Sequence, residues 1–205
     1  MYIWYINFTP MTRLLFLFSF LTGAFFAQGQ SFFVGGGVNG FFINNPTDDA
    51  SSFMRRGYQI GGDVSLGEVF YLRSGAFFTA TQSNINFSVD NEDVSGIFRA
   101  SHLRIPVKGG LRFYDKDHLS IFVETGISAM IRLGVGGSET TGEDLSFLED
   151  EYRAHHWGWV IGGGIRINFI EISVYYDAGL TRAFNADGSE SSRFGLLQLN
   201  MGFNF

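Results

Sequence analysis

Two adjacent histidines, His155 and His156, are the residues of this chain whose spacing most readily suggests catalysis. With Ser146 and nearby acids they could form a hydrolytic centre at a membrane surface, where a histidine activates a serine nucleophile. The sequence contains neither a Gly-x-Ser-x-Gly elbow nor a His-Glu-x-x-His zinc motif. Adjacent residues of a strand also point to opposite faces, which would separate the two rings. We therefore expect that the protein is not an enzyme.

Clustered carboxylates are a second source of possible chemistry, because hard divalent cations prefer oxygen ligands. The densest run is Leu148-Glu149-Asp150-Glu151. It lacks the spaced ligand pattern of a defined calcium loop, so solvated charge is the expected state. We predict no metal site and no cofactor.

A third group of charges lies on the polar positions of stretches that are otherwise apolar at alternate residues. Successive side chains of a strand point to opposite faces, so these charges are expected to share one face of a sheet. The group consists of Asp63, Arg73, Arg104, Lys108, Arg112, Glu124, Arg132, Arg166, Glu171 and Asp177. Inside a small barrel these bases and acids would have to pair, because unpaired buried charge is costly. We predict a lumen charge network, whose pairings depend on a strand register that one sequence does not fix.

Eight stretches of period-two hydrophobicity would hold these side chains. In residues 102–113, for example, His102, Arg104, Lys108 and Arg112 occupy the even positions, opposite an apolar face. The pattern is weaker near residues 32–42, where three glycines occur together, and near 70–79, where Tyr71 and Phe77 share the presumed inner face with Arg73. In the sixth stretch, Asn168 is assigned to the inner face and Phe169 to the outer one.

The connections between these stretches alternate between long and short. Short links are expected near residues 67–68, 115–118 and 169–170, and long ones near 44–55, 82–98, 134–155 and 182–192. Outer-membrane barrels have even strand numbers, short periplasmic turns and long external loops. The sequence thus predicts an all-β fold, an eight-stranded antiparallel up-and-down transmembrane β-barrel with both termini in the periplasm of a Gram-negative bacterium. The long links hold most of the acids, so acidic external loops are expected.

A soluble lipocalin-like barrel that binds a ligand inside is the alternative, since its polar face would simply meet water. Trp157, Trp159 and Phe205 favour the membrane, because aromatic residues gather at the interfaces of transmembrane barrels.

The N-terminal segment has the pattern of a secretory signal peptide. Arg13 precedes an apolar run from Leu14 to Phe26, and Ala27-Gln28-Gly29 resembles a cleavage site. The run is shorter than the roughly 18 residues that a spanning helix needs. We predict removal of residues 1–29, with translation starting at Met1 or at Met11, and a single barrel domain over residues 30–205.

Composition excludes several classes. The chain has no Cys, which excludes a disulfide framework, thiol catalysis and a cysteine-linked lipid anchor. A formal net charge of −6 gives no basic surface for nucleic acid. The 24 Phe and 27 Gly suit many strands joined by tight turns, not a disordered chain.

Several motifs together resemble the PorT-like outer-membrane β-barrel family of Bacteroidota. Leu103-Arg104-Ile105-Pro106-Val107 is similar to that family's L-x-I-P-hydrophobic signature. Further similar strand motifs are Gly35-Gly36-Gly37-Val38-Asn39, Gly162-Gly163-Gly164-Ile165, Tyr175-Tyr176-Asp177-Ala178-Gly179-Leu180 and Gly202-Phe203-Asn204-Phe205. The resemblance covers nearly all of residues 30–205, although Lys108-Gly109-Gly110 is less hydrophobic than the family pattern. It implies a small outer-membrane barrel, with one member type tied to protein secretion, and a bulge or local break at Pro106.

The C-terminal strand ends in aromatic residues, and Phe203 and Phe205 resemble the signal that the outer-membrane assembly machinery reads. The simpler interpretation is two lipid-facing aromatic rings.

Two function classes follow for such a barrel. It could be a structural or interaction protein, a monomer in outer-membrane lipid whose external loops contact an envelope or extracellular protein, a surface polymer or a secretion component. It could instead be a narrow solute channel, although eight strands enclose a lumen that side chains fill. The first class is favoured.

Overall fold

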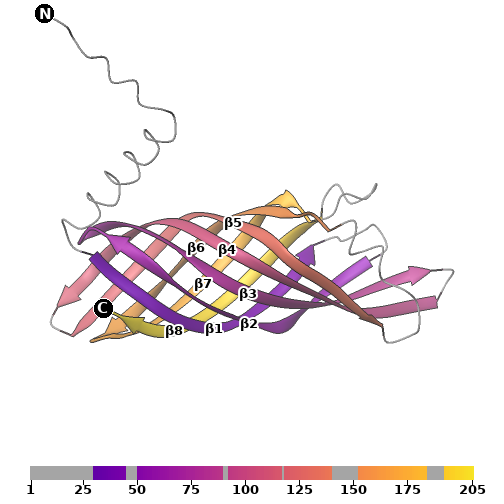
Figure 1. Ribbon diagram of the computed structural model, residues 1–205, viewed down its shortest axis with the longest axis horizontal. Coiled ribbons are helices and arrows are strands. Elements are labelled where there is room, and N and C mark those ends of the chain that lie inside the picture. Colours follow the sequence, from indigo (N-terminus) through magenta and orange to yellow (C-terminus); the bar gives the residue numbers. More distant parts are fainter. Residues whose placement is uncertain (1–29, 45–49, 90–91, 117, 140–151, 184–191) are drawn as a thin grey trace, which may run out of the picture.

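The computed structural model describes residues 30–44, 50–89, 92–116, 118–139, 152–183 and 192–205. Within them eight antiparallel strands close into one barrel, in which each strand pairs with its sequence neighbours and the last pairs with the first (Figure 1). The strands are β1 (Gln30–Asn44), β2 (Ala50–Leu66), β3 (Phe70–Val89), β4 (Glu92–Lys116), β5 (Leu119–Glu139), β6 (His155–Ile167), β7 (Ile170–Arg182) and β8 (Arg193–Asn204). The predicted eight-stranded antiparallel barrel is confirmed. No helix in these ranges is long and apolar enough to cross a membrane.

The barrel closes where β1 meets β8. Their register runs from Phe33 opposite Asn204 to Asn44 opposite Arg193. At the end of this seam the Phe32 amide donates to the Phe205 carbonyl at 2.8 Å, and the Phe205 amide donates to the Phe32 carbonyl at 2.9 Å. Closure leaves no unpaired sheet edge, which is what allows a sheet to cross lipid.

The three short connections lie at residues 67–69, 117–118 and 168–169. Gly67 has φ 111° and Asn168 has φ 54°, in the left-handed region that glycine adopts freely and asparagine tolerates. The third turn was expected at 169–170, with Asn168 and Phe169 in the sixth strand. That detail is wrong, because β6 ends at Ile167 and the left-handed Asn168 begins the turn.

At the opposite end the strands are longer than the sequence predicted. β2 already begins at Ala50, β3 continues to Val89, β4 begins at Glu92 and β5 continues to Glu139. The β3–β4 hairpin (magenta) extends furthest at the right of Figure 1. The predicted loops over 44–55, 82–98 and 134–155 are therefore wrong in these parts, whereas 182–192 agrees with the ends of β7 and β8. Outside lipid neither face of a strand must be apolar, so backbone pairing continues where the hydrophobic alternation stops.

Pro106 interrupts one ladder only. β4 pairs with β5 through Pro106 opposite Ser128, but its pairing with β3 stops at Val107 and resumes at Arg104 in the same register. A proline has no N–H to donate, which accounts for the gap on the β3 side. The expected local break is present, without a register shift.

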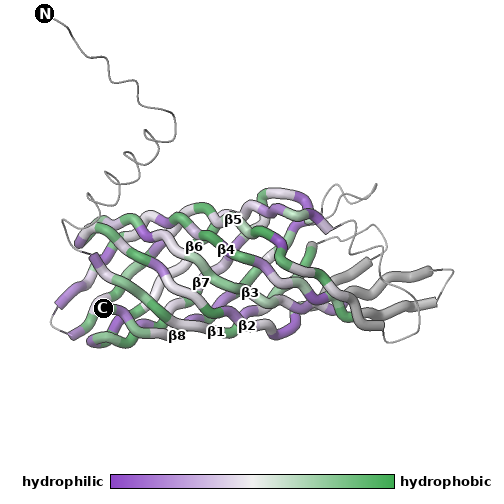
Figure 2. Tube along the Cα trace, in the orientation of Figure 1, coloured by the Kyte–Doolittle hydropathy of each residue, from purple (hydrophilic) through white to green (hydrophobic). Residues whose placement is uncertain are grey.

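Hydrophobic and hydrophilic residues alternate along the strands in Figure 2, and the two faces of the strands differ as this alternation predicts. Large apolar side chains are exposed on the outer face of every strand, among them Val38, Ile60, Leu72, Val107, Val123, Ile161, Val174 and Leu199. Polar and charged side chains are buried on the inner face. An apolar exterior around a polar interior is the arrangement of a barrel that lies in lipid. The predicted signal peptide (residues 1–29), Ser146 and the acidic run 149–151 lie outside the described residues.

Candidate functional site in the barrel lumen

The inner face of β4 shows how the lumen changes along its length. From the short-turn end, its buried side chains are Lys108, Pro106, Arg104, His102, Ala100 and Phe98. Charged side chains are thus followed by the neutral, polar imidazole of His102 and then by apolar side chains. The lumen has two differently filled halves.

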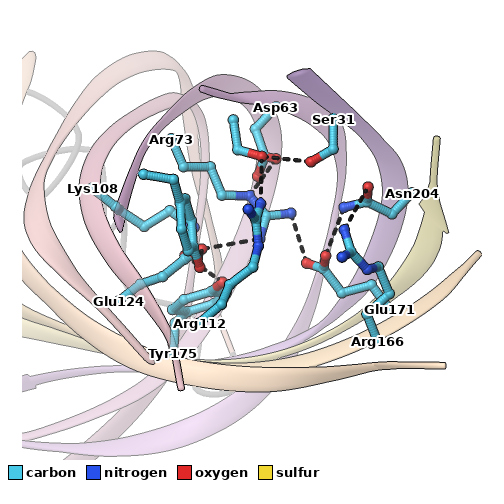
Figure 3. A network of polar contacts seen from close by, with 12 residues as sticks. Ser31, Asp63, Arg73, Lys108, Arg112, Glu124, Arg166, Glu171, Tyr175 and Asn204 are labelled. Atoms are coloured by element: carbon cyan, nitrogen blue, oxygen red, sulfur yellow. Dashed lines mark hydrogen bonds and ion pairs between the residues drawn. The ribbon is translucent and has the colours of Figure 1, made fainter. Parts of the chain in front are cut away.

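The half nearer the short turns is organised around Arg73, in β3. Its guanidinium binds three carboxylates from three other strands: Nε donates to Asp63 Oδ1 at 2.5 Å, Nη1 to Glu124 Oε1 at 3.0 Å and Nη2 to Glu171 Oε1 at 2.6 Å. Figure 3 shows the Arg73 side chain in the middle of the lumen between these acids. The planar fork of arginine suits such multiple binding, because its five donors point in fixed directions.

Glu124, from β5, joins Arg73 to further groups. Lys108 Nζ lies 2.5 Å from Glu124 Oε2. The Tyr71 hydroxyl donates to Glu124 Oε1 and the Tyr175 hydroxyl to Glu124 Oε2, each at 2.6 Å. The Lys108 ammonium also lies 4.0 Å from the centroid of the Tyr175 ring, a cation–π distance. Every acceptor of this buried carboxylate is used, which offsets the cost of removing it from water. We call Asp63, Arg73, Lys108, Glu124 and Glu171 the charged layer.

A second buried ion pair lies further along the lumen. Arg104 binds Asp177 through two parallel hydrogen bonds of 2.8 and 2.9 Å. Ser128 and Gln198 donate to the same carboxylate at 2.8 and 3.0 Å. Gln59 donates to both Gln198 and Asn200, which completes a polar bridge between β2 and β8.

The remaining three members of the predicted network form no ion pair with the residues of these two clusters. Arg112 is half-buried and donates to the Gly67 carbonyl at 2.9 Å, so it holds the first short turn. Arg166 approaches Asp115 at 3.6 Å near the same end. Arg132 lies toward the opposite end, where its Nη1 donates to the Tyr152 carbonyl at 2.6 Å. The structure thus brings together seven of the ten predicted residues, in two clusters, and places the other three near the ends of the lumen.

The half nearer the long connections is filled by apolar and aromatic groups that sequence reasoning missed. They form one buried cluster, the aromatic plug, which consists of Phe41, Ile43, Phe98, Ala100, Met130, Tyr152, Ala183, Phe194 and Leu196. The rings of Phe41 and Phe194 stack at 6.3 Å, and those of Phe98 and Tyr152 lie 5.0 Å apart. Burial raises the pKa of the Tyr152 hydroxyl well above its ordinary value, so the group stays neutral.

Two buried histidines line the base of this plug. His102 Nε2 and the Tyr152 hydroxyl share a hydrogen bond of 2.9 Å, and the His102 and His156 rings lie 6.1 Å apart. Neither ring nitrogen of His156 has a hydrogen-bond partner among the described residues. His155 is exposed on the outer face, so the two adjacent histidines do point in opposite directions. The described residues contain no group of three or more His, Asp or Glu side chains that could hold a metal.

Glycines on the inner face give a sequence signal for the inward aromatic residues. Tyr71 is the cross-strand partner of Gly110, Phe122 of Gly164, and Tyr175 of Gly162. A Cβ at any of these glycines would collide with the facing ring. Each large ring therefore packs over a glycine of the neighbouring strand, as in other curved sheets. An inward glycine opposite an alternating aromatic residue could have revealed these packing pairs.

Little free space remains between the two ion-paired clusters. One cavity there has a volume of about 10 Å³, and Asp63, Arg73, Arg104, Lys108 and Glu171 are among its lining residues. That is about the space of a single water molecule. Within the part of the chain that the structure describes, the lumen holds paired charges in one half and packed rings in the other.

The predicted interfacial and terminal aromatics all lie on the outer face. Trp157 and Trp159 are about half exposed and lie near the start of strand β6, close to the long connections. Phe203 and Phe205 are exposed at the short-turn end, where the Phe203 ring stacks on Phe169 at 6.0 Å.

Comparison with known proteins agrees with this architecture. The model of the family described as "Outer membrane protein beta-barrel domain" matches residues 26–185. No curated protein matches the chain in sequence. Among solved structures, the outer membrane protein OprG from Pseudomonas aeruginosa is 10% identical, with a TM-score of 0.53 over 87% of this chain and 97% of that one. Ail, the attachment invasion locus protein of Yersinia pestis, solved with the heparin analogue sucrose octasulfate, is 14% identical over 87% of this chain and all of that one, with a TM-score of 0.44.

At 10% identity, the likeness to OprG shows a shared fold and nothing more. The family match covers most of the chain, and the barrel is closed, with an apolar exterior and buried charged and polar side chains in its lumen. The chain belongs to the outer membrane protein beta-barrel domain family and is an outer-membrane protein of Gram-negative bacteria.

Proposed function

We propose that this protein is a closed, non-conducting barrel that supports its external segments for contact with a partner at the cell surface. The filling of the lumen carries this proposal. A solute that entered would have to displace either the ion pairs of the charged layer or the rings of the aromatic plug. Breaking a buried ion pair costs about 3–5 kcal/mol, which makes a steady open pore unfavourable.

The proposed orientation places the short turns and both termini of the barrel domain, residues 30 and 205, in the periplasm. Short turns face the periplasm in outer-membrane barrels, and the C-terminus and the start of β1 lie at the same end (Figure 1). The connections over 140–154 and 183–192 then face outward. Protease digestion of intact cells tests this orientation: cleavage within 140–151 is expected, and cleavage only after disruption of the outer membrane would contradict it.

The proposed partner is an extracellular or envelope protein, a surface polymer or a component of a secretion apparatus. The connecting sequences are rich in acids, among them Asp90, Glu143, Asp144, Glu149, Asp150 and Glu151. Acidic segments favour partners with basic surfaces, because complementary charge speeds association and excludes like-charged competitors. Crosslinking on whole cells should capture a partner with the native chain, and recovery should fall when Glu149, Asp150 and Glu151 are changed to their amides.

The proposed route to the membrane is the outer-membrane assembly machinery, with Phe203 and Phe205 as its recognition residues and a monomer as the product. Both rings are accessible on the outer face. Deletion of Phe205 is expected to reduce the amount of barrel in the outer membrane. Normal assembly of that variant would favour a simple lipid contact.

Planar-bilayer recording tests the closed lumen. The refolded protein should give no steady conductance. Glu124→Gln changes the charged layer, and Glu68→Gln changes an exposed acid near the first short turn as the matched control. Steady channels whose conductance changes in Glu124→Gln but not in Glu68→Gln would establish the alternative, a narrow solute channel.

A further inference from the structure

The outer rim near the long connections carries three exposed arginines. Arg56, in β2, and Arg182 and Arg193, in β7 and β8, are exposed. We call these three the arginine rim. No acidic side chain that the structure describes forms an ion pair with any of them.

The acids are segregated from this rim within the described part of the chain. Of the acidic residues whose side chains are described, four lie in the lumen, namely Asp63, Glu124, Glu171 and Asp177. The other two, Glu68 and Asp115, are exposed at the short-turn end. Among the described side chains, the arginine rim is therefore a local group of positive charges in a chain whose net charge is −6.

Two of the arginines face each other directly. Arg182 and Arg193 are cross-strand partners at the end of the β7–β8 ladder, where the register shifts. Like charges placed directly opposite each other destabilise a sheet. An anion bound between the two guanidiniums would remove this repulsion, and guanidinium binds phosphate with two parallel hydrogen bonds.

An apolar groove lies beside the rim on the lipid-facing side. It has a volume of about 450 Å³ and is lined by Val38, Gly40, Met54, Leu197 and Leu199, with Arg55 and Arg56. Arg55 is engaged elsewhere, since its Nη1 donates to Asn84 Oδ1 at 2.8 Å. Arg193 stands on the outer face of β8, beyond Leu199 and Leu197 along the same strand. The surface thus has an apolar groove along the outside of the barrel wall, with cationic side chains at the end of the groove.

We propose that this surface binds a phosphate-bearing lipid of the external leaflet, with an acyl chain in the groove and the phosphate at the arginine rim. Charge complementarity and the apolar lining select this occupant, since a soluble anion would leave the groove unused and an uncharged lipid would leave the arginines unneutralised. The location in the external leaflet rests on the proposed orientation of the barrel.

The test uses the full barrel in phosphatidylcholine nanodiscs and native mass spectrometry of the lipid retained after release. The probes are dioleoyl phosphatidic acid, which has both phosphate and chains, dioleoylglycerol, which lacks the phosphate, and inorganic phosphate, which lacks the chains. We expect phosphatidic acid to be retained in preference to phosphatidylcholine, whose choline cation neutralises its phosphate, and we expect no retention of dioleoylglycerol or inorganic phosphate. In Arg182→Gln/Arg193→Gln, retention should fall about tenfold or more, as expected for the loss of two cations near a lipid phosphate.

Arg99→Gln is the matched control, because Arg99 is an exposed arginine in β4, away from the groove. It should retain the lipid as the native protein does. Arg56→Gln provides a second, milder variant, and heat-dependent gel mobility verifies that each variant is folded.

Unchanged retention in both the double variant and Arg56→Gln would overturn the proposal. So would displacement of the lipid by millimolar inorganic phosphate, or the recovery of a protein dimer with no lipid attached. Because nanodiscs expose both leaflets, this readout does not depend on orientation, which the protease experiment measures separately.

Discussion

Around Arg73 the lumen is filled by groups that each need a particular partner, whereas around Phe194 it is filled by groups that need only to exclude water. In the charged layer, one guanidinium binds three carboxylates. One of these, Glu124, also accepts hydrogen bonds from two tyrosines and pairs with a lysine. The aromatic plug contains stacked rings and aliphatic side chains. The difference teaches that stability in the first half depends on every buried charge having a partner. In the second half it depends on the volume that the buried side chains fill.

The largest expected effect comes from removing the centre of the charged layer. Arg73→Met leaves Asp63 and Glu171 without the buried cation they share, and should lower the free energy of unfolding by about 4 kcal/mol. Urea unfolding in lipid vesicles, followed by tryptophan fluorescence, measures this loss.

Arg99→Met is the control for that variant, because it removes an exposed arginine of the same barrel. It should change stability by less than about 0.5 kcal/mol. Equal losses in the two variants would mean that pairing in the lumen contributes little.

Phe194→Ala tests the other half. The Phe194 side chain is fully buried among Phe41, His156 and the rest of the plug. Its removal should cost about 3 kcal/mol through lost burial and the remaining cavity. Phe194→Leu should recover most of this loss, because volume rather than pairing is at stake. If Leu were no better than Ala, the proposed contrast between the two halves would be wrong.

Lys108→Met should have a smaller effect than Arg73→Met, because Glu124 keeps Arg73, Tyr71 and Tyr175 as partners. We expect a loss of about 2 kcal/mol, the value of one strong bond to a charged group. Unfolding curves of the native protein and the variant under identical lipid conditions give the difference. A loss as large as that of Arg73→Met would assign the central role to lysine.

The smallest effect sharpens the same comparison. Tyr71→Phe removes one hydroxyl donor from Glu124 and leaves the ring over Gly110, so a loss of about 1 kcal/mol is expected. Tyr176→Phe is the control, because the Tyr176 side chain is on the outer face. The two variants should differ in urea midpoint and agree in the slope of the transition.

Particular residues show how far the sequence could lead. Alternation alone placed Asp63, Arg73, Glu124 and Glu171 on one face, because a strand offers only two faces. It could not say that Arg73 binds Glu171, 98 positions later, since that contact depends on the register around the whole barrel. The strand count and antiparallel order followed from the links, whose lengths are local properties.

The plug escaped prediction for a different reason. Phe41 and Phe98 point inward at positions where the alternation rule expects polar groups. Phe98 falls in the range 82–98 that the sequence predicts as a loop, and Phe41 falls in the stretch 32–42, where three glycines weaken the alternation. The inward glycines opposite Tyr71, Phe122 and Tyr175 are a signal that a sequence analysis could use.

The hydrogen bonds between Phe32 and Phe205 bring the first and last strands of the barrel into register with each other. The sheet is consequently a ring in which no strand is first in any structural sense. A circular permutant that joins residue 205 to residue 30 through a short linker, and opens at residues 117–118, should form the same barrel. In such a chain the order in which the strands are synthesised would differ from that of the native chain, while their places in the fold would be the same. Phe203 and Phe205 would then lie in the middle of the sequence and no longer at its C-terminus.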